Sequence, residues 1–206
     1  MKIILDYVKR VLGSPYLFNL FETVVGVGAA RKRLVNNFII PFDGASILDI
    51  GCGTGVIIDY LPDNIKYVGF DLSSKYIDYA KNKYKKQGKF YCEDINKISN
   101  LQPNTFDFVV SIGVIHHLNN NEAITLLNKA KKYLKPGGVL TTMYPIFIKN
   151  QSRISRFMMN NDRGDYIRNI GGYRELFSRV FKKTDDYIVN DMLMYSYEHY
   201  ITHSKK

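Results

Sequence analysis

The sequence predicts an α/β fold in which a mostly parallel sheet carries helices on both faces and ends in an antiparallel hairpin. From residue 46 onward, short apolar runs alternate with segments of helical periodicity, which is typical of parallel strands joined by helices. One apolar run leads directly into a glycine-rich turn at residues 47–55. Two β-like segments, near residues 184–190 and 194–202, close the chain and predict the hairpin.

The individual elements follow from local patterns. Residues 1–43 look mostly helical, with a break at residues 13–15, and residues 56–61 look like a short helix after the glycines. The clearest helix is expected at residues 121–134, where apolar side chains recur at helical spacing. Pro136-Gly137-Gly138 is expected to end that helix. Parallel-type strands are expected at residues 46–50, 66–70, 89–92, 106–111 and 138–143, and a further helix near residues 173–181.

Length and composition predict one globular domain without an export signal or membrane anchor. The chain has 206 residues, of which 46% are hydrophobic and 23% charged. No run approaches the roughly 18 apolar residues of a membrane span, and two cysteines are too few for a disulfide framework. We expect a cytoplasmic protein. Its expected parts are an N-terminal helical cap, a ligand-binding core, a substrate-side insertion and a C-terminal β-hairpin, at residues 1–43, 44–144, 145–182 and 183–206.

The net charge of +10 leaves several partners open. A lysine-rich helix near residues 81–89 is usually a solvated face, although nucleic acid, an anionic membrane surface or a phosphorylated ligand would also suit it. No arginine-rich stripe with interleaved aromatic residues indicates RNA, so nucleic acid is not the expected partner. Peripheral contact with a membrane stays open.

The turn at Gly51, Gly53 and Gly55 predicts a nucleotide-type ligand site. Glycine adopts positive φ angles without steric cost and lets a ligand approach the bare backbone. The third glycine comes one residue too early for a dinucleotide fingerprint, and Val56 stands where that glycine would be. Asp71 follows the first glycine by 20 residues, at the end of the next strand, where an acidic residue holds ribose hydroxyls.

Five segments in order resemble the motifs of the class I S-adenosylmethionine-dependent methyltransferases. They cover much of residues 44–143, and the last of them is the complete Leu-x-Pro-Gly-Gly-x-Leu turn of the family. The resemblance implies a Rossmann-like, seven-stranded sheet whose last strand is antiparallel, and S-adenosyl-L-methionine as cofactor. The five segments are Ile47–Gly55, Val68–Ser73, Tyr91–Ile95, Phe106–Ser111 and Leu134–Leu140.

The resemblance also implies roles for individual residues. The amides of the glycine turn, including Cys52, would hold the amino-acid end of the cofactor together with Asp49. Asp71 would accept both ribose hydroxyls and Leu72 would pack on adenine. The adenine edge would meet the Asp94 carboxylate and the Ile95 amide, and the methionine portion would lie along Ser111 and Ile112.

Candidate residues for chemistry lie beyond the fourth strand. Histidine accepts protons near neutral pH, so His116 is the first candidate for a general base, ahead of His117. Tyr144, His199 and Arg163 are candidate acceptor-site residues. Each also has an ordinary structural reading: a pocket-lining or capping histidine, a hairpin residue or a solvated charge. No metal ligands are expected.

The leading interpretation is a methyltransferase that acts on an oxygen of a small, sugar- or phosphate-bearing acceptor. The sequence lacks the Asn/Asp-Pro-Pro-aromatic run of nucleobase amine methyltransferases after the fourth strand, where Ser111–Val114 stand instead. An RNA or protein methyltransferase and a cofactor-binding protein without turnover remain alternatives. An NAD-dependent oxidoreductase is disfavoured by Val56 and by the absence of a suitably placed Tyr-x-x-x-Lys pair. The oligomeric state stays open.

Overall fold

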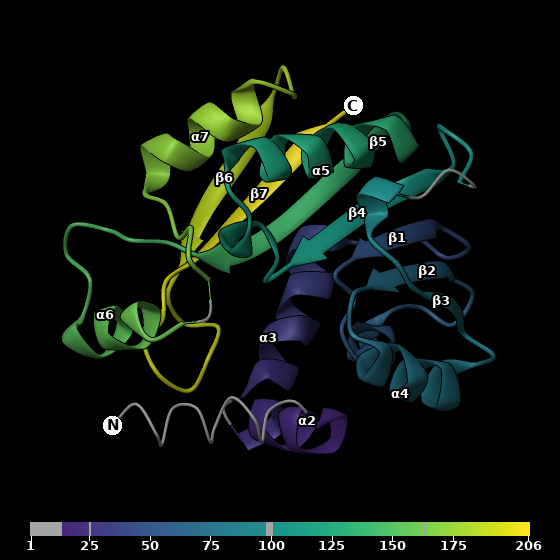
Figure 1. Cartoon of the computed structure of the whole chain (residues 1–206), viewed down its shortest axis with the longest axis horizontal. Coiled ribbons are helices and arrows are strands. Elements are labelled where there is room, and N and C mark those ends of the chain that lie inside the picture. Colours follow the sequence, from purple (N-terminus) through teal and green to yellow (C-terminus); the bar gives the residue numbers. More distant parts are fainter. Residues whose placement is uncertain (1–13, 25, 98–100, 163) are drawn as a thin grey trace.

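The computed structural model describes residues 14–206, except residue 25, residues 98–100 and residue 163. Its centre is a seven-stranded sheet with the strand order β3-β2-β1-β4-β5-β7-β6 (Figure 1). The strands are β1 (Ser46–Ile50), β2 (Lys66–Asp71), β3 (Gly88–Cys92), β4 (Phe106–Ile112), β5 (Leu134–Pro145), β6 (Thr184–Val189) and β7 (His199–Lys205).

The strand directions confirm the predicted mixed sheet. β1 to β5 pair in parallel, whereas β7 pairs antiparallel with both β5 and β6. Ile50 is in register with Phe70 across β1 and β2, and Asp71 with Cys92 across β2 and β3. The loops after these parallel strands therefore meet at one edge of the sheet, where ligands bind in open α/β folds.

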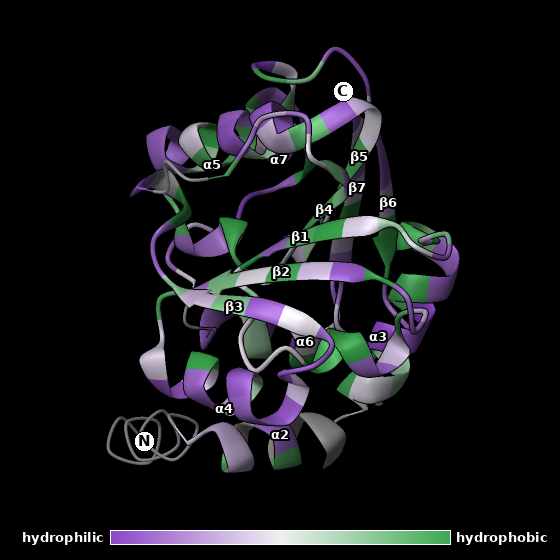
Figure 2. Ribbon diagram, turned by 90° about the vertical axis from the view of Figure 1, so that its right-hand side faces the viewer, coloured by the Kyte–Doolittle hydropathy of each residue, from purple (hydrophilic) through white to green (hydrophobic). Residues whose placement is uncertain are grey.

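Helices cover both faces of the sheet (Figures 1 and 2). One face packs on α5 and α7 through side chains such as Leu127 and Phe177. The other packs on α3 and α4 through side chains such as Leu34 and Ile77. Full burial of one such side chain contributes roughly 1.5–3 kcal/mol, so both layers hold the sheet rigidly. The α-helices are α2 (Pro15–Val24), α3 (Val27–Leu34), α4 (Ser74–Tyr84), α5 (Asn120–Tyr133), α6 (Arg153–Asn160) and α7 (Ile170–Ser178).

The helical segment after the glycine turn is shorter than the helix that usually connects two parallel strands. Residues Val56–Tyr60 form a 3-10 helix, η2, instead of an α-helix. It begins after Gly55, whose φ angle is 73°, and ends at Leu61, which is extended because Pro62 follows it. Short 3-10 and π-helical segments also occur as η1 (Val35–Ile39), η3 (Ile95–Lys97) and η4 (Ile115–His117).

The end of α5 differs from the prediction. The helix ends at Tyr133, and Leu134 already belongs to β5, so Pro136-Gly137-Gly138 lies inside the strand. The pairing of β4 with β5 shifts its register between Phe106 and Phe108. Gly137 has a φ angle of 78°, and a Cβ on Gly138 would lie 2.9 Å from the Asp107 carbonyl oxygen. The glycines therefore permit an irregular strand start that periodicity does not show.

Two predictions for the C-terminal third are wrong in detail. The last strand begins at His199 and not near residue 194, so residues 190–198 form a long connection. The Arg33–Asp191 ion pair, at 2.7 Å, and the buried Met192 draw this connection toward α3. Residues 145–182 contain α6, which was not expected, as well as α7, which starts a few residues before the predicted helix.

The N-terminal cap lies over the glycine turn. Thr54 in the turn donates a hydrogen bond to Asn19 on α2, with 2.8 Å between the oxygens. Residues 1–13, part of the predicted cap, lie outside the described residues. Among the helices that the structure describes, none has the length and apolar character needed to cross a bilayer.

Candidate functional site

The glycine turn is fixed by the neighbouring strand. The Gly51 and Cys52 N–H groups both donate to the Phe70 carbonyl oxygen, at 2.8 and 2.9 Å. Gly51 has a φ angle of 79°, and a Cβ there would lie 2.2 Å from the Val114 side chain. A Cβ on Gly53 would instead meet no atom within 4 Å. The turn thus closes against β2 and the β4 loop, while its middle glycine faces open space.

Asp71 stands beside the turn with both carboxylate oxygens oriented by the backbone. Oδ2 accepts from the Gly53 N–H at 2.9 Å, and Oδ1 accepts from the Ser73 N–H at 2.8 Å. Each carboxylate oxygen can accept more than one hydrogen bond, so both keep capacity for a ligand. The sequence spacing between the glycines and Asp71 is therefore confirmed as spatial proximity.

Asp49 lies beneath the turn as a buried carboxyl group. Tyr67 donates a hydrogen bond to its Oδ2 at 2.7 Å. The pKa of Asp49 is raised to about 7, chiefly because the group is buried; the Tyr67 hydrogen bond and the Arg31 charge lower this pKa, and the Asp71 charge adds to the rise. This carboxyl group therefore changes its charge near neutral pH, one strand away from Asp71.

The residues expected around adenine are arranged unevenly. Leu72 is 76% exposed, which leaves a large apolar side chain next to Asp71 without protein cover. The Asp94 side chain is half-buried, and the Ile95 side chain is 5% exposed in the core, which leaves its backbone for any ligand contact. An exposed leucine beside an oriented carboxylate suits a flat ring stacked next to a ribose.

The two residues expected near the methionine portion occupy the end of β4. Ser111 is fully buried, and its hydroxyl donates to the Ile50 carbonyl oxygen at 3.1 Å. Ile112 is half-buried and packs with the α3-side core. The Ser111 hydroxyl therefore joins β4 to β1, next to the start of the glycine turn.

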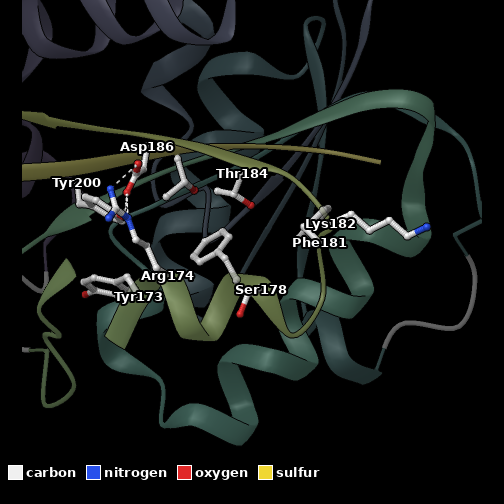
Figure 3. A pocket seen from close by; sticks show the side chains of 10 residues that line it. Tyr173, Arg174, Ser178, Phe181, Lys182, Thr184, Asp186 and Tyr200 are labelled. Atoms are coloured by element: carbon white, nitrogen blue, oxygen red, sulfur yellow. Dashed lines mark hydrogen bonds and ion pairs between the residues drawn. The ribbon is translucent and has the colours of Figure 1, made fainter. Parts of the chain in front are cut away.

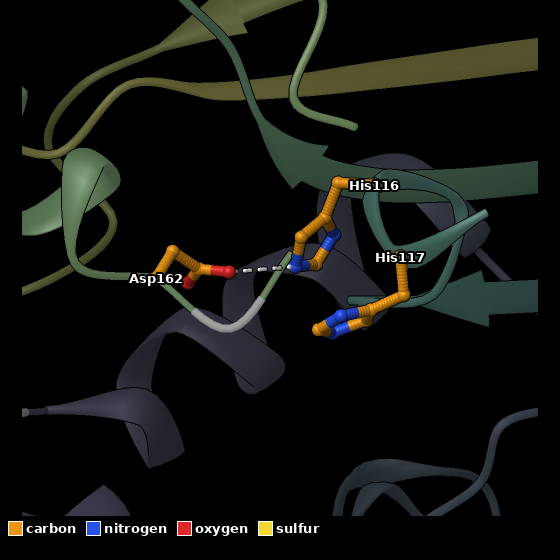
Figure 4. Close-up of side chains that lie close together, drawn as sticks. All are labelled: His116, His117 and Asp162. Carbon is orange, nitrogen blue, oxygen red and sulfur yellow. Dashed lines mark ion pairs between the residues drawn. The ribbon is translucent and has the colours of Figure 1, made fainter. Parts of the chain in front are cut away.

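His116 connects the β4 loop to the insertion through its backbone and its side chain, and its carbonyl oxygen accepts a hydrogen bond from the Tyr166 N–H at 2.9 Å. Its Nε2 lies 3.1 Å from Asp162 Oδ1 (Figure 4). The His116 side chain is buried, and its Nδ1 has no hydrogen-bond partner. Burial raises the pKa of Asp162, but the His116 hydrogen bond, the His116 charge and the Gly164 N–H together hold that pKa below its usual value.

Asp162 was not predicted as a site residue, whereas the next residue in the sequence was. Arg163, the predicted acceptor-site residue, lies outside the described residues. Asp162 Oδ1 accepts from the Gly164 N–H at 2.7 Å, and a Cβ on Gly164 would lie 2.1 Å from His116 Cδ2. The Asp-x-Gly pattern is typical of such an Asx turn. It could have indicated a fixed carboxylate here, although not its partner.

Comparison with known proteins identifies a domain in the central part of the chain. Residues 47–138 match the model of a methyltransferase domain. An uncharacterized methyltransferase of Schizosaccharomyces pombe is 35% identical over 117 residues, which are 52% of this chain and 40% of that protein. A ubiquinone biosynthesis O-methyltransferase of Idiomarina loihiensis is 25% identical over 122 residues, 57% of this chain and 49% of the relative. Residues 47–138 therefore form a methyltransferase domain of the S-adenosylmethionine-dependent type.

The solved structures agree on the fold of this methyltransferase. A TehB-like S-adenosylmethionine-dependent methyltransferase from Corynebacterium glutamicum superposes with a TM-score of 0.62 at 22% identity, covering 86% of this chain and 88% of that one. The chain spans half or less of the length of the two curated relatives above. S-Adenosylmethionine is the cofactor of this family. The open space at Gly53, the oriented Asp71 and the exposed Leu72 fit such a ligand.

Three side chains near the β4 loop together offer the atoms of a metal-ligand set. His116, His117 and Asp162 each offer a ligand atom, and these atoms lie within 4.8 Å of one another (Figure 4). The direct His116–Asp162 contact accounts for the approach of two of them without an ion. The absence of metal ligands therefore stays a prediction.

Tyr144 and His199 lie at the end of β5 and at the start of the paired strand β7. Tyr144 is buried in an aromatic cluster with Tyr173, 4.2 Å between ring centroids. His199 is in register with Pro145, and burial lowers its pKa to about 4. This value keeps His199 neutral at pH 7 and makes it a weak base. Neither side chain is presented to solvent.

A separate hollow of about 230 Å³ lies between α7 and the β6–β7 hairpin of the methyltransferase (Figure 3). Arg174 crosses it and pairs with Asp186 at 2.7 Å. Tyr200 also donates a hydrogen bond to Asp186. The hollow lies on the α7 face, whereas the residues predicted to bind the cofactor lie at the carboxyl edge of β1 and β2. Its polar groups are largely engaged with one another.

Proposed function

We propose that this protein transfers the methyl group of S-adenosylmethionine to an oxygen atom of a small acceptor that bears a sugar or phosphate group. One relative of the chain is a ubiquinone biosynthesis O-methyltransferase, and this similarity supports transfer to oxygen. S-Adenosylmethionine supplies an electrophilic methyl group when bound, so the protein has to position the acceptor and remove its proton.

The His116–Asp162 pair carries this proposal. If Asp162 receives the Nε2–H of neutral His116, the basic lone pair is on Nδ1, which is buried and unpartnered. In the proposed step the acceptor hydroxyl would give its proton to His116 Nδ1 as its oxygen bonds the methyl carbon, while the methyl–sulfur bond breaks and the sulfur leaves as a neutral thioether. Asp162 fixes the tautomer and stabilises the imidazolium that forms.

The location of His116 supports this role. Val114, two residues earlier, packs against Gly51 of the glycine turn. The loop that carries His116 therefore borders the cofactor side directly. Asp162 brings the insertion, the expected acceptor side, to the same histidine.

His116→Ala tests the proposal. We expect kcat to fall by about 100- to 10,000-fold, the usual contribution of a positioned general base, with an unchanged Kd for S-adenosylmethionine. Methyl transfer from labelled cofactor into small-molecule extracts and into an RNA fraction measures the first quantity, and calorimetry the second. His117→Ala is the matched control and should retain most activity. Equal losses in both variants, or label only in RNA, would contradict the proposal, and binding without transfer to any fraction would favour the non-catalytic alternative.

A further inference from the structure

Helix α6 carries a solvent-facing apolar strip. Its inner side is anchored by Ser155 and Met159, which are buried. On its outer side Ile154 is 66% exposed and Phe157 is 57% exposed. Residues three apart lie on the same face of a helix, so these two side chains form one strip. Large apolar side chains grouped in this way on a surface indicate a binding surface.

The charged side chains on α6 and in the segment just before it are all positive. Residues 146–161 contain Lys149, Arg153 and Arg156 and no Asp or Glu. All three basic side chains are exposed. An apolar strip between cations is the pattern of a helix that lies in the plane of a membrane, with its apolar side chains among the acyl chains and its basic ones on anionic headgroups.

The β6–β7 connection, which is attached to α6, carries a further exposed apolar side chain. Glu198 in this connection is buried and accepts hydrogen bonds from Ser155 and Gln151, which attaches the connection to α6. Met194, farther along it, is 80% exposed and lies against Gly26 at the α2–α3 junction. Both ribbon views place α6 and α2 on the side of the sheet away from α5 and α7 (Figures 1 and 2). We call Ile154, Phe157, Met194, Arg153 and Arg156 the docking face.

We propose that the docking face binds the surface of an anionic phospholipid bilayer and that the methyl acceptor is a lipid-anchored molecule. The second part rests on the proposed function. Asp162, which contacts His116, follows α6 by two residues. Binding of α6 to a bilayer therefore places the acceptor side of the site at the membrane surface, where a lipid-anchored hydroxyl group can reach it.

Vesicle flotation tests the docking face. Vesicles of one part phosphatidylglycerol to two parts phosphatidylcholine should bind the protein, and pure phosphatidylcholine vesicles should bind it much less. The Ile154→Glu/Phe157→Glu variant should reduce the partition coefficient at least about tenfold. Tyr187→Glu/Ile188→Glu on edge strand β6, at 43% and 44% exposure, is the matched control because it makes the same chemical change elsewhere. It should bind like the wild type.

The charges and the acceptor have their own tests. Arg153→Gln/Arg156→Gln should weaken binding to anionic vesicles by about fivefold per arginine, and added salt should reduce that difference. Equal binding to both vesicle types, equal loss in the β6 control, or displacement of the vesicles by an RNA oligonucleotide would overturn the docking proposal. Methyl label should enter the organic phase of a lipid extract, and label confined to the aqueous phase would overturn the lipid-anchored acceptor.

The failure of this inference can be told apart from failure of the proposed function. Calorimetry with S-adenosylmethionine reports folding and cofactor binding for every variant without any membrane. If the wild-type protein does not bind vesicles but transfers methyl groups to soluble acceptors, the docking face and the lipid-anchored acceptor are rejected and the proposed function stands. Vesicle binding without methyl transfer to any fraction would reject only the proposed function.

Discussion

The cofactor half and the acceptor half of this methyltransferase are built in different ways. Around Gly51 and Asp71, short loops hold the site through backbone N–H groups whose partners lie on the adjacent strand. Around Asp162, side chains join the insertion to the β4 loop: Asp162 contacts His116, and Arg168 donates hydrogen bonds to the Ile115 and Leu118 carbonyl oxygens. A site of the first kind keeps its shape as long as the sheet is folded. A site of the second kind depends on the position of one long segment, residues 145–182.

The most severe way to break the cofactor half is Asp71→Ala. This change removes both ribose acceptors and leaves the Gly53 and Ser73 N–H groups without their partner. We expect S-adenosylmethionine to bind at least about 100-fold more weakly, because hydrogen bonds to a charged group contribute roughly 1.5–3 kcal/mol each. Titration calorimetry measures the loss. Asp78→Ala on α4 is the control, and an unchanged Kd for Asp71→Ala would refute the cofactor site.

The acceptor half is tested by Asp162→Asn. An amide keeps the size of the side chain but can present its NH₂ to His116, which misorients the imidazole. We expect kcat to fall by about 10- to 100-fold, the cost of a small misplacement of a catalytic group, while cofactor affinity stays unchanged. A parallel loss of cofactor affinity would show that the two halves are not separable.

A milder test is the pH dependence of cofactor binding. Free Asp49 is protonated below its pKa of about 7, and the cationic groups of S-adenosylmethionine favour its ionised form. Binding then releases a proton below pH 7, so affinity should rise with pH by up to about tenfold per unit and level off above that value. Asp49→Asn should flatten the profile between pH 6 and 8. If the Asp49→Asn variant keeps the same dependence of affinity on pH, the titrating group is not Asp49.

The smallest expected effect concerns the attachment of the insertion. Glu198→Gln removes the charge from the acceptor of the Ser155 and Gln151 hydrogen bonds. We expect the free energy of unfolding to fall by about 1 kcal/mol, measured by urea titration. Proteolysis within residues 145–162 should also become faster. Asp185→Asn, exposed on β6, is the control, and equal shifts in both variants would show that Glu198 has no special anchoring role.

The contrast between the halves also explains which features could be predicted from the sequence. Gly51 and Asp71 act through local conformation and strand spacing, both of which are visible in the sequence, and the parallel pairing of β1 to β5 follows from the alternation of strands and helices. The His116–Asp162 contact joins distant segments through two side chains, so no periodicity signals it. Helix α6 was not predicted because its apolar side chains Ile154 and Phe157 face outward. Its buried residue Ser155 bonds to Glu198, which is distant in the sequence.

The short η2 segment has a consequence for cofactor choice. A long α-helix that starts at a glycine turn directs a positive dipole at its ligand, which favours phosphate groups. Here only five residues, Val56–Tyr60, follow the turn, in a 3-10 helix. The turn therefore offers N–H donors with little added positive potential. A ligand that brings its own sulfonium and ammonium charges meets less repulsion there, and a dinucleotide loses much of its usual attraction. The short length of η2 therefore contributes to selectivity between cofactors at this turn.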